Sequence, residues 1–198
     1  MFRFLFSKKK PITVNFDNLR LVRPNMRYFN SFRESYKEYK AHKVEDFGYY
    51  KVDTLDDFRR FLVLAEDYRR GFNLPKNYVQ TSMFWLTDGT NYLGSGSVRH
   101  YLNDKLRVFG GHIGYSIRPN AWGQGLGTIQ LRFLLNEARN IGLRRVRLTC
   151  YENNAASQRV MEKNGAFYVD RVVNHISGKD RPTLIYEIDL TDELENSD

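Results

Sequence analysis

The stretch from Ile113 to Thr128 constrains the fold of this chain more than any other. It begins as an alternating apolar run, which indicates a strand, and passes through Pro119 into glycines at positions 123, 125 and 127. Apolar residues then recur at helical spacing. The first N–H groups of a helix lack intrahelical acceptors and lie at the positive end of its dipole, and glycines let an anion come close. The stretch therefore predicts an anion site, suited to phosphate, between a strand and a helix.

The spacing of these glycines differs from that of two common nucleotide-binding motifs. A dinucleotide-binding loop needs G-x-G-x-x-G, and Thr128 stands where the third glycine of that motif would be. A Walker loop needs a lysine after its last glycine, and none follows Gly127. We therefore expect a phosphate-binding loop of another kind, or an ordinary turn before a helix.

Composition and charge leave two interpretations open. The 198 residues are 41% hydrophobic and 15% aromatic, which excludes a disordered chain and suffices for one good core. The net charge of +8 fits attraction to phosphate, in nucleic acid or in a phosphorylated cofactor, and it also fits a solvated basic surface. Because the basic residues are scattered and only residues 8–10 form a run, we favour the surface over nucleic acid.

The sequence also indicates a compartment. Its single cysteine, Cys150, excludes an intramolecular disulfide and fits a reducing environment. The apolar run at residues 4–6 is too short for a signal peptide, and no stretch is long enough to span a membrane. We predict a cytoplasmic protein with neither a membrane partner nor a metal.

The first half of the chain predicts a short strand, two helices and three antiparallel strands. The strand covers 19–23, one helix covers 26–42, and a second runs from Thr54, its N-cap, to Gly71. The three strands cover 80–87, 91–102 and 107–117. Glycines inside these strands mark bulges or places where another backbone comes close: Gly94, Gly96, Gly110, Gly111 and Gly114.

The second half predicts a helix after the glycine loop, ended by Gly142, and a strand over 145–151 with one buried face. A short helix over 153–164 follows, and then two strands, 167–173 and 183–190, joined by a turn. With no repeats and no flexible linker, we predict a single domain over 19–190. Residues 1–18 form a lead-in, and 191–198 form an acidic tail.

This order of elements, with the loop at 122–127 and the segment Cys150–Ser157, resembles the GNAT superfamily of acetyl-CoA-dependent N-acetyltransferases. The resemblance spans roughly residues 19–190, and the run 110–119 resembles a group of bacterial acetyltransferases. It implies an α+β (α/β) fold: a twisted, mostly antiparallel seven-stranded sheet with about four flanking helices. Strands 4 and 5 are expected to splay apart.

The resemblance also assigns a cofactor site. The family loop, Arg/Gln-x-x-Gly-x-Gly/Ala, binds the pyrophosphate of CoA, and this chain matches it at Gly125 and Gly127 but has Trp122 at the first position. The match implies backbone contacts from the loop, formed by Trp122, Gly123, Gln124, Gly125, Leu126, Gly127 and Thr128. Losing the family's charged residue removes charge assistance and leaves the amide donors.

Further residues are implied along the expected gap between strands 4 and 5. Asn154 and Ser157 match family positions near the pantetheine arm, and both also fit ordinary roles, an N-cap and a solvated helix residue. Pantetheine is expected to pair with the strand backbone after Tyr115, and an N–H near Ile117 to polarise the thioester. An amine then attacks directly, without an acyl-enzyme.

Acid–base residues are harder to place. His112 lies near the position of a glutamate base in several family members, and it equally fits a structural histidine bonded to a neighbouring strand. The tyrosine that many relatives use as general acid is Met161 here, which leaves Tyr151 or Tyr115 as substitutes. Cys150 lies in an apolar strand and fits a buried, inert thiol.

The sequence therefore predicts transfer of an acetyl group from acetyl-CoA to a small-molecule or peptide amine. Two alternatives stay open: a non-enzymatic acyl-CoA-binding module on the same fold, and, less favoured, a basic nucleic-acid-binding protein. A homodimer is also left open.

Overall fold

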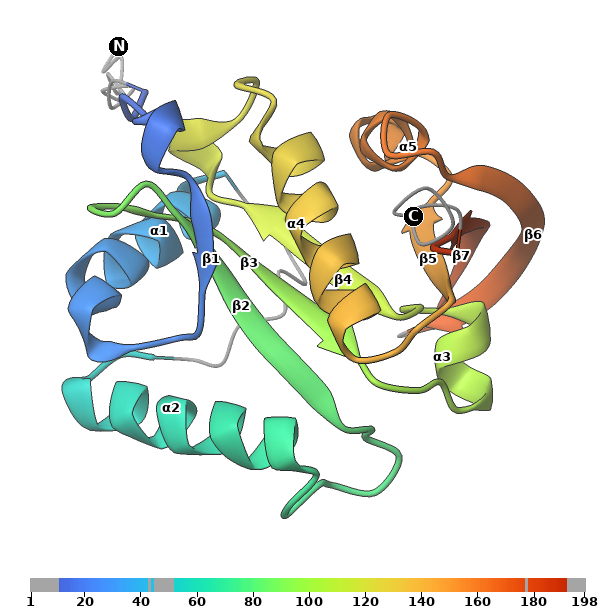
Figure 1. The fold of residues 1–198 in the computed structure, drawn as a ribbon, viewed down its shortest axis with the longest axis horizontal. Coiled ribbons are helices and arrows are strands. Elements are labelled where there is room, and N and C mark those ends of the chain that lie inside the picture. The colour runs from blue at the N-terminus through green and yellow to red at the C-terminus, as the bar shows by residue number, and fades with distance from the viewer. Residues whose placement is uncertain (1–10, 43, 45–51, 177, 192–198) are drawn as a thin grey trace, which may run out of the picture.

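Two antiparallel sheets meet at one end and diverge at the other (Figure 1). The computed structural model describes residues 11–42, 44, 52–176 and 178–191. The first sheet runs in the order β1 (Arg20–Val22), β2 (Thr81–Thr87), β3 (Tyr92–Arg99) and β4 (Ile113–Ile117). The second contains β5 (Arg145–Tyr151), β7 (Lys179–Asp189) and β6 (Phe167–Ile176), with β7 in the middle. The break lies between the fourth and fifth strands, which confirms the predicted α/β fold and its splay.

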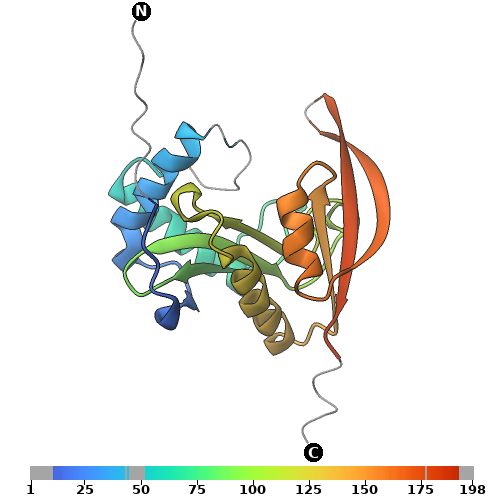
Figure 2. The same cartoon turned by 90° about the horizontal axis from the view of Figure 1, so that it is seen from above.

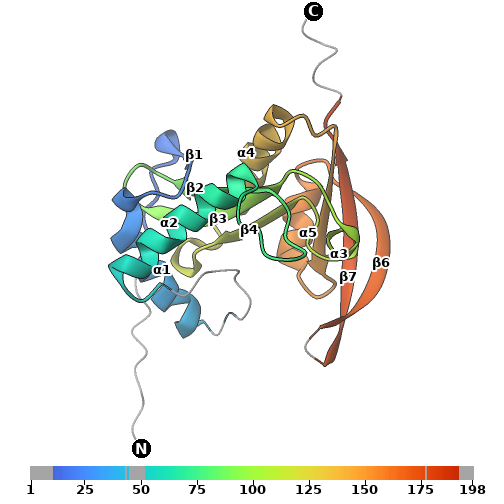
Figure 3. The same cartoon turned by 90° about the horizontal axis from the view of Figure 1, so that it is seen from below.

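Helices cover both faces of the first sheet (Figures 2 and 3). On one face α4 (Leu126–Asn140) packs against β3 and β4, and on the other α1 (Phe29–Ala41) and α2 (Leu55–Arg70) cover β2 and β3. The short helix α3 (Asp104–Val108) precedes β4, and α5 (Ala155–Glu162) follows β5. Within the described ranges, no helix is both long enough and apolar enough to cross a bilayer.

The predicted helix caps are confirmed. The Thr54 hydroxyl accepts from the Asp57 N–H at 3.1 Å, and the Asp57 carboxylate accepts from the Thr54 N–H at 2.9 Å, which forms a complete capping box on α2. Gly71 ends α2 in the left-handed conformation at φ 76°, and Gly142 follows α4 at φ 87°. These ends are fixed by local sequence.

Two predicted boundaries are wrong. The strand predicted over 107–117 begins only at Ile113, because the Asn103 side chain accepts from the Leu106 N–H and caps α3 in its place. The turn predicted between the last two strands is also too long, since β6 extends to Ile176 and β7 begins at Lys179. Pro182 suggested that turn, but it lies one residue beyond the pairing with β5, where β7 has a neighbouring strand on one side only.

The core has two main parts. One joins α4 to both sheets through fully buried residues such as Leu134, Leu148 and Met161. The other is an aromatic cluster beneath α1 and α2, where Phe32 stacks on Trp85 with ring centroids 4.9 Å apart. A buried ion pair between Glu38 and Arg118 ties α1 to the end of β4.

Of the five glycines predicted to mark bulges or close backbone approaches, Gly94 and Gly111 do lie against another backbone, whereas Gly96, Gly110 and Gly114 lie against side chains. A Cβ on Gly94 would lie 2.3 Å from the Ser116 carbonyl oxygen, and one on Gly96 would lie 2.5 Å from the Leu134 side chain. Gly111 has a φ of 61°, and a Cβ there would lie 2.4 Å from the Arg147 carbonyl oxygen. Gly111 thus allows the two sheets to touch.

We predict that Gly111→Ala destabilises the fold strongly. The left-handed backbone alone costs a non-glycine residue roughly 1–3 kcal/mol, and the clash with β5 adds to that. Gly142→Ala is the matched control, because Gly142 is also left-handed and a Cβ there would meet nothing within 4 Å. Urea unfolding of both variants measures the difference, and equal losses of stability would contradict the close contact between the sheets.

Candidate functional site

A wedge-shaped gap separates β4 from β5. At its closed end, the His112 N–H donates to the Arg147 carbonyl at 2.7 Å, and the Arg147 N–H donates to Nδ1 of the His112 ring at 2.9 Å. Beyond these bonds β4 and β5 form no ladder. The edge of β4 that faces β5 is therefore left without a neighbouring strand.

The hydrogen-bonding pattern of β4 shows which residues face this gap. The Arg99 N–H donates to the His112 carbonyl, and the Arg118 N–H donates to the Leu93 carbonyl. Backbone groups alternate between the two edges of a strand, so even-numbered residues of β4 bond to β3. The backbone N–H and C=O groups of Tyr115 and Ile117 consequently point toward the gap, and the Ile117 carbonyl accepts from the Trp122 indole at 2.6 Å.

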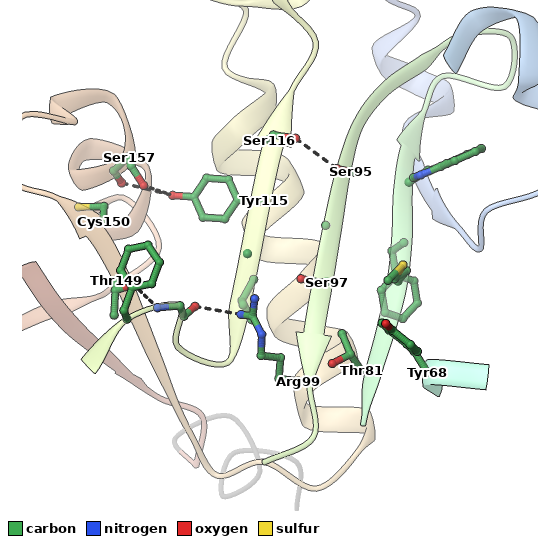
Figure 4. Close-up of a pocket in the computed structure, with 18 of the residues that line it drawn as sticks. Tyr68, Thr81, Ser95, Ser97, Arg99, Tyr115, Ser116, Thr149, Cys150 and Ser157 are labelled. Atoms are coloured by element: carbon green, nitrogen blue, oxygen red, sulfur yellow. Dashed lines mark hydrogen bonds between the residues drawn. The ribbon is translucent and has the colours of Figure 1, made fainter. Parts of the chain in front are cut away.

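A cavity of about 710 Å³ opens beside this edge (Figure 4). Its lining comes from α2, β2, β3, β4, β5 and the start of α5, and combines aromatic side chains with hydroxyl groups from Ser95, Ser97 and Ser116. Among the described residues that line it, none carries a carboxylate or an imidazole, and Arg99 is the one cation. The cavity is therefore largely aromatic, with a polar side that carries hydroxyls and a positive charge.

Tyr115 spans the gap. Its hydroxyl lies 2.9 Å from the Ser157 hydroxyl on α5, as the dashed line in Figure 4 shows. Burial raises the pKa of Tyr115 to about 12. The phenol therefore remains protonated near neutral pH and can donate a hydrogen bond inside the cavity.

The glycine loop leads into α4 without a side-chain cap. Gly123 and Gly125 are left-handed, at φ 77° and 78°, and a Cβ on either would meet nothing within 4 Å. In the part of the chain that the structure describes, no group accepts from the backbone N–H groups of residues 123–127. The Gln124 side chain donates instead to the Ile12 carbonyl at 3.3 Å. The loop thus presents free amide donors at a helix N-terminus, which fits a diphosphate.

Other predicted cofactor residues border the loop or the cavity. Asn154 caps α5 by accepting from the Ser157 N–H at 3.0 Å, and both residues also line the cavity. Trp122 is 48% exposed, and its ring lies against His42.

The Thr128 carbonyl accepts from the Asn164 side chain, which links α4 to the end of α5. A Cβ on Gly127 would lie 3.2 Å from Val160, so this glycine also lets α4 approach α5.

The geometry of His112 favours a structural role over a catalytic one. Its ring does not line the cavity, and Nδ1 is occupied by the Arg147 N–H, which places the proton of the neutral ring on Nε2. Burial and the guanidinium groups of Arg107 and Arg147 lower the pKa of His112 from 6.5 to about 4. Its role as general base stays a prediction that this geometry does not support.

The remaining candidates are distributed between core and cavity. Met161, which stands where the resemblance would lead one to expect a tyrosine, is fully buried in the core. Tyr151 lines the cavity, packs against Phe109 and lies under the Arg181 guanidinium. Burial raises the pKa of Cys150 to about 11, which fits the expected inert thiol.

The structure also brings in residues that sequence reasoning missed. Arg99 and the serines of β3 alternate along one face, which ends at the cavity. This alternation is visible in the sequence Ser95-Gly96-Ser97-Val98-Arg99, but an alternating polar face usually faces solvent.

Comparison with known families decides the identity of the fold. A model described as the acetyltransferase (GNAT) domain matches residues 25–166. The chain belongs to the GNAT acetyltransferase family. It is therefore an acyl-CoA-dependent acetyltransferase, as predicted from the loop and the Asn154 segment.

Solved GNAT structures share the fold at low sequence identity. A putative acetyltransferase from Salmonella typhimurium, solved with acetyl-CoA, is 18% identical with a TM-score of 0.59, over 87% of this chain and 94% of that one. A microcin C7 self-immunity acetyltransferase, solved with acetyl-CoA and AMP, is 17% identical with a TM-score of 0.65, over 92% and 97%.

A third structure is an acetyltransferase from Salmonella typhimurium that modifies the N-terminal serine of ribosomal protein L7/L12. It is 16% identical with a TM-score of 0.63, over 87% of this chain and 95% of that one. A search of curated protein sequences found no match.

We predict that His112 stabilises the closed end of the gap through a neutral ring. His112→Ala should lower the free energy of unfolding by about 1–3 kcal/mol, because it leaves the Arg147 N–H without an acceptor. His112→Asn should recover most of this loss, since the Asn Oδ1 can replace Nδ1. Calorimetric unfolding measures both variants.

The pH dependence of stability distinguishes the two variants further. The pKa of His112 lies lower in the folded protein than in the unfolded chain, so the unfolded chain takes up the proton first. The stability that the neutral His112 ring contributes to the folded protein is fully present above about pH 6.5 and is lost as the pH falls toward 4. Relative to wild type, His112→Asn should lose less stability across this range. If the stability of His112→Asn and that of the wild-type protein depended on pH in the same way, the neutral ring at position 112 would be wrong.

Proposed function

We propose that this enzyme transfers the acetyl group of acetyl-CoA to a primary amine, on a small molecule or a peptide, by direct attack within a ternary complex. The observation that carries the proposal is the free edge of β4, which lies between an uncapped glycine loop and a cavity lined by aromatic rings and hydroxyl groups. An extended chain with amide groups can pair with such an edge as an additional strand would.

The residues present fit acetyl-CoA as the donor. The amides of residues 123–127 would hold the pyrophosphate, and the outward backbone groups of Tyr115 and Ile117 would hold the pantetheine arm. Because the Trp122 indole already occupies the Ile117 carbonyl, the Ile117 N–H is the group left to polarise the thioester carbonyl. Asn154 and Ser157 border the same arm.

The chemistry of the transfer is constrained by the cavity. The described lining offers no carboxylate or imidazole that could take a proton from an ammonium ion, so we infer that the acceptor enters already as the neutral amine. As the thiolate leaves, Tyr115 or Tyr151 could donate a hydrogen bond. Phenylalanine variants of each, compared at saturating substrates, would show which tyrosine contributes.

The proposal also covers the class of acceptor, the cellular compartment and the oligomeric state. A peptide acceptor is supported by the fold shared with the enzyme that modifies L7/L12. We infer a cytoplasmic setting from the single cysteine, and we retain the homodimer as a hypothesis.

We predict that Gly125→Glu abolishes acetyl-CoA binding. At about 100 times its dissociation constant, a ligand adds about 2.7 kcal/mol of stability, which corresponds to a rise of roughly 5–10 °C in melting temperature. The glutamate places a carboxylate among the free amide donors and should remove this rise. Thermal unfolding with and without acetyl-CoA measures it.

Gly142→Glu is the matched control for this test. It adds the same side chain at a left-handed glycine with open space around it, at the other end of α4. The control should keep the full acetyl-CoA shift. No shift in the wild-type protein would exclude the donor, and binding without CoA release across an amine panel would favour a non-enzymatic acyl-CoA-binding module.

We also predict that the pH dependence of kcat/KM follows the acceptor. A peptide α-amine has a pKa of about 8 and a lysine side chain one of about 10.4, so the two rates should level off roughly two pH units apart. The measurement is CoA release between pH 6 and 11 with one acceptor of each kind. A common inflection for both acceptors would instead indicate a base on the enzyme.

A further inference from the structure

Arg99 is a partly buried cation at the end of β3 that lines the cavity. One of its terminal nitrogens donates to the carbonyls of Gly110 and Gly111, at 3.0 and 2.9 Å. In the described part of the chain no carboxylate pairs with it. Burial lowers the pKa of its guanidinium, and no nearby acid opposes that shift.

The unused donors of Arg99 lie close to the β4 backbone. A Cβ built on Gly114 would lie 3.9 Å from both terminal nitrogens of the guanidinium. Because Gly114 carries no side chain, the guanidinium lies close to the β4 backbone, and Figure 4 draws Arg99 among the residues that line the cavity. The Nη2 and Nε groups have no acceptor among the described residues.

Three serine hydroxyls lie on the same face of the sheet as this cation. Ser97 adjoins Gly114, and the Ser95 and Ser116 hydroxyls lie 3.2 Å apart further along the same face. Hydroxyls together with a guanidinium donate well to the oxygens of a carboxylate or a phosphate. With no acid in the described lining and a net charge of +8 on the whole chain, the cavity suits an anionic group.

We propose that the acceptor amine carries a carboxylate or phosphate group, and that Arg99 binds this group and so determines substrate specificity. The inference rests on the proposed amine acetylation. Gly114 lies one to three residues from the outward groups of Tyr115 and Ile117, a span of roughly 3–10 Å along the strand. The anionic group of the acceptor should therefore lie within that distance of its amine.

Matched acceptors test the charge requirement and distinguish its two chemical sources. For carboxylates, the pair is Ala-Asp-Ala amide and Ala-Asn-Ala amide; for phosphates, it is ethanolamine phosphate and ethanolamine. We expect the anionic member of at least one pair to show a kcat/KM roughly 10- to 100-fold higher, the range of a charge-assisted hydrogen bond. Equal rates within both pairs would overturn the proposal.

Variants of Arg99 then test whether this residue causes the preference for an anionic acceptor. Arg99→Gln should raise KM for the anionic acceptor by a much larger factor than for the neutral acceptor, which removes the preference, and Arg99→Lys should restore part of it. Arg59→Gln is the control for net charge, since Arg59 is exposed on α2 and does not line the cavity. If Arg99→Gln weakens both acceptors equally, Arg99 serves only to hold Gly110 and Gly111.

Calorimetric binding to the CoA complex separates this proposal from the proposed function. If no acceptor is acetylated but the anionic acceptor binds about tenfold more tightly and only with Arg99 present, the anion site stands and amine acetylation fails. If amines are acetylated and bind without regard to charge, amine acetylation stands and the anion site fails. Acetyl-CoA affinity should be unchanged in Arg99→Gln.

Discussion

The candidate site depends on β4 and β5 being joined at one end only. His112 and Arg147 exchange two hydrogen bonds there, and Gly111 lets the backbones touch. Past this point the strands separate, so the outward N–H and C=O of Tyr115 and the N–H of Ile117 lack the partners that a continuous sheet would supply, while the Ile117 carbonyl accepts from Trp122. Buried backbone groups require partners. A ligand with its own amides can supply them, which makes the divergence itself the binding feature.

The width of the gap is set by contacts on either side of it. Tyr115 reaches across to Ser157, and Gly127 allows α4 to lie against Val160 of α5. The glycine loop thus has two physical roles. Gly123 and Gly125 adopt left-handed conformations in open space, which leaves their amides accessible, whereas Gly127 serves the packing of two helices. Because the three glycines are evenly spaced in the sequence, these two roles could not be told apart without the structure.

Local features could be predicted from the sequence because their causes are local. The capping box at Thr54 and the left-handed Gly71 depend on residues within one turn, and the loop together with the Cys150–Ser157 segment and the order of elements indicated the family that the family model confirms. The partner of His112 could not be predicted, since Arg147 lies 35 residues away and the bond is made by its backbone. Helix α3 was missed because its cap, Asn103, fits a turn equally well.

The electrostatics of the cavity connect the two proposals. A site for a protonated amine would be expected to present a carboxylate, and the described lining presents Arg99 instead. A partly buried guanidinium without a carboxylate partner among the described residues carries a desolvation cost, which an anionic ligand in the cavity would offset. A neutral amine tethered to an anionic group satisfies both observations, because the anion offsets the cost of Arg99 while the amine needs no counter-charge. The same tether would hold the amine beside the thioester, where fixed orientation accelerates attack.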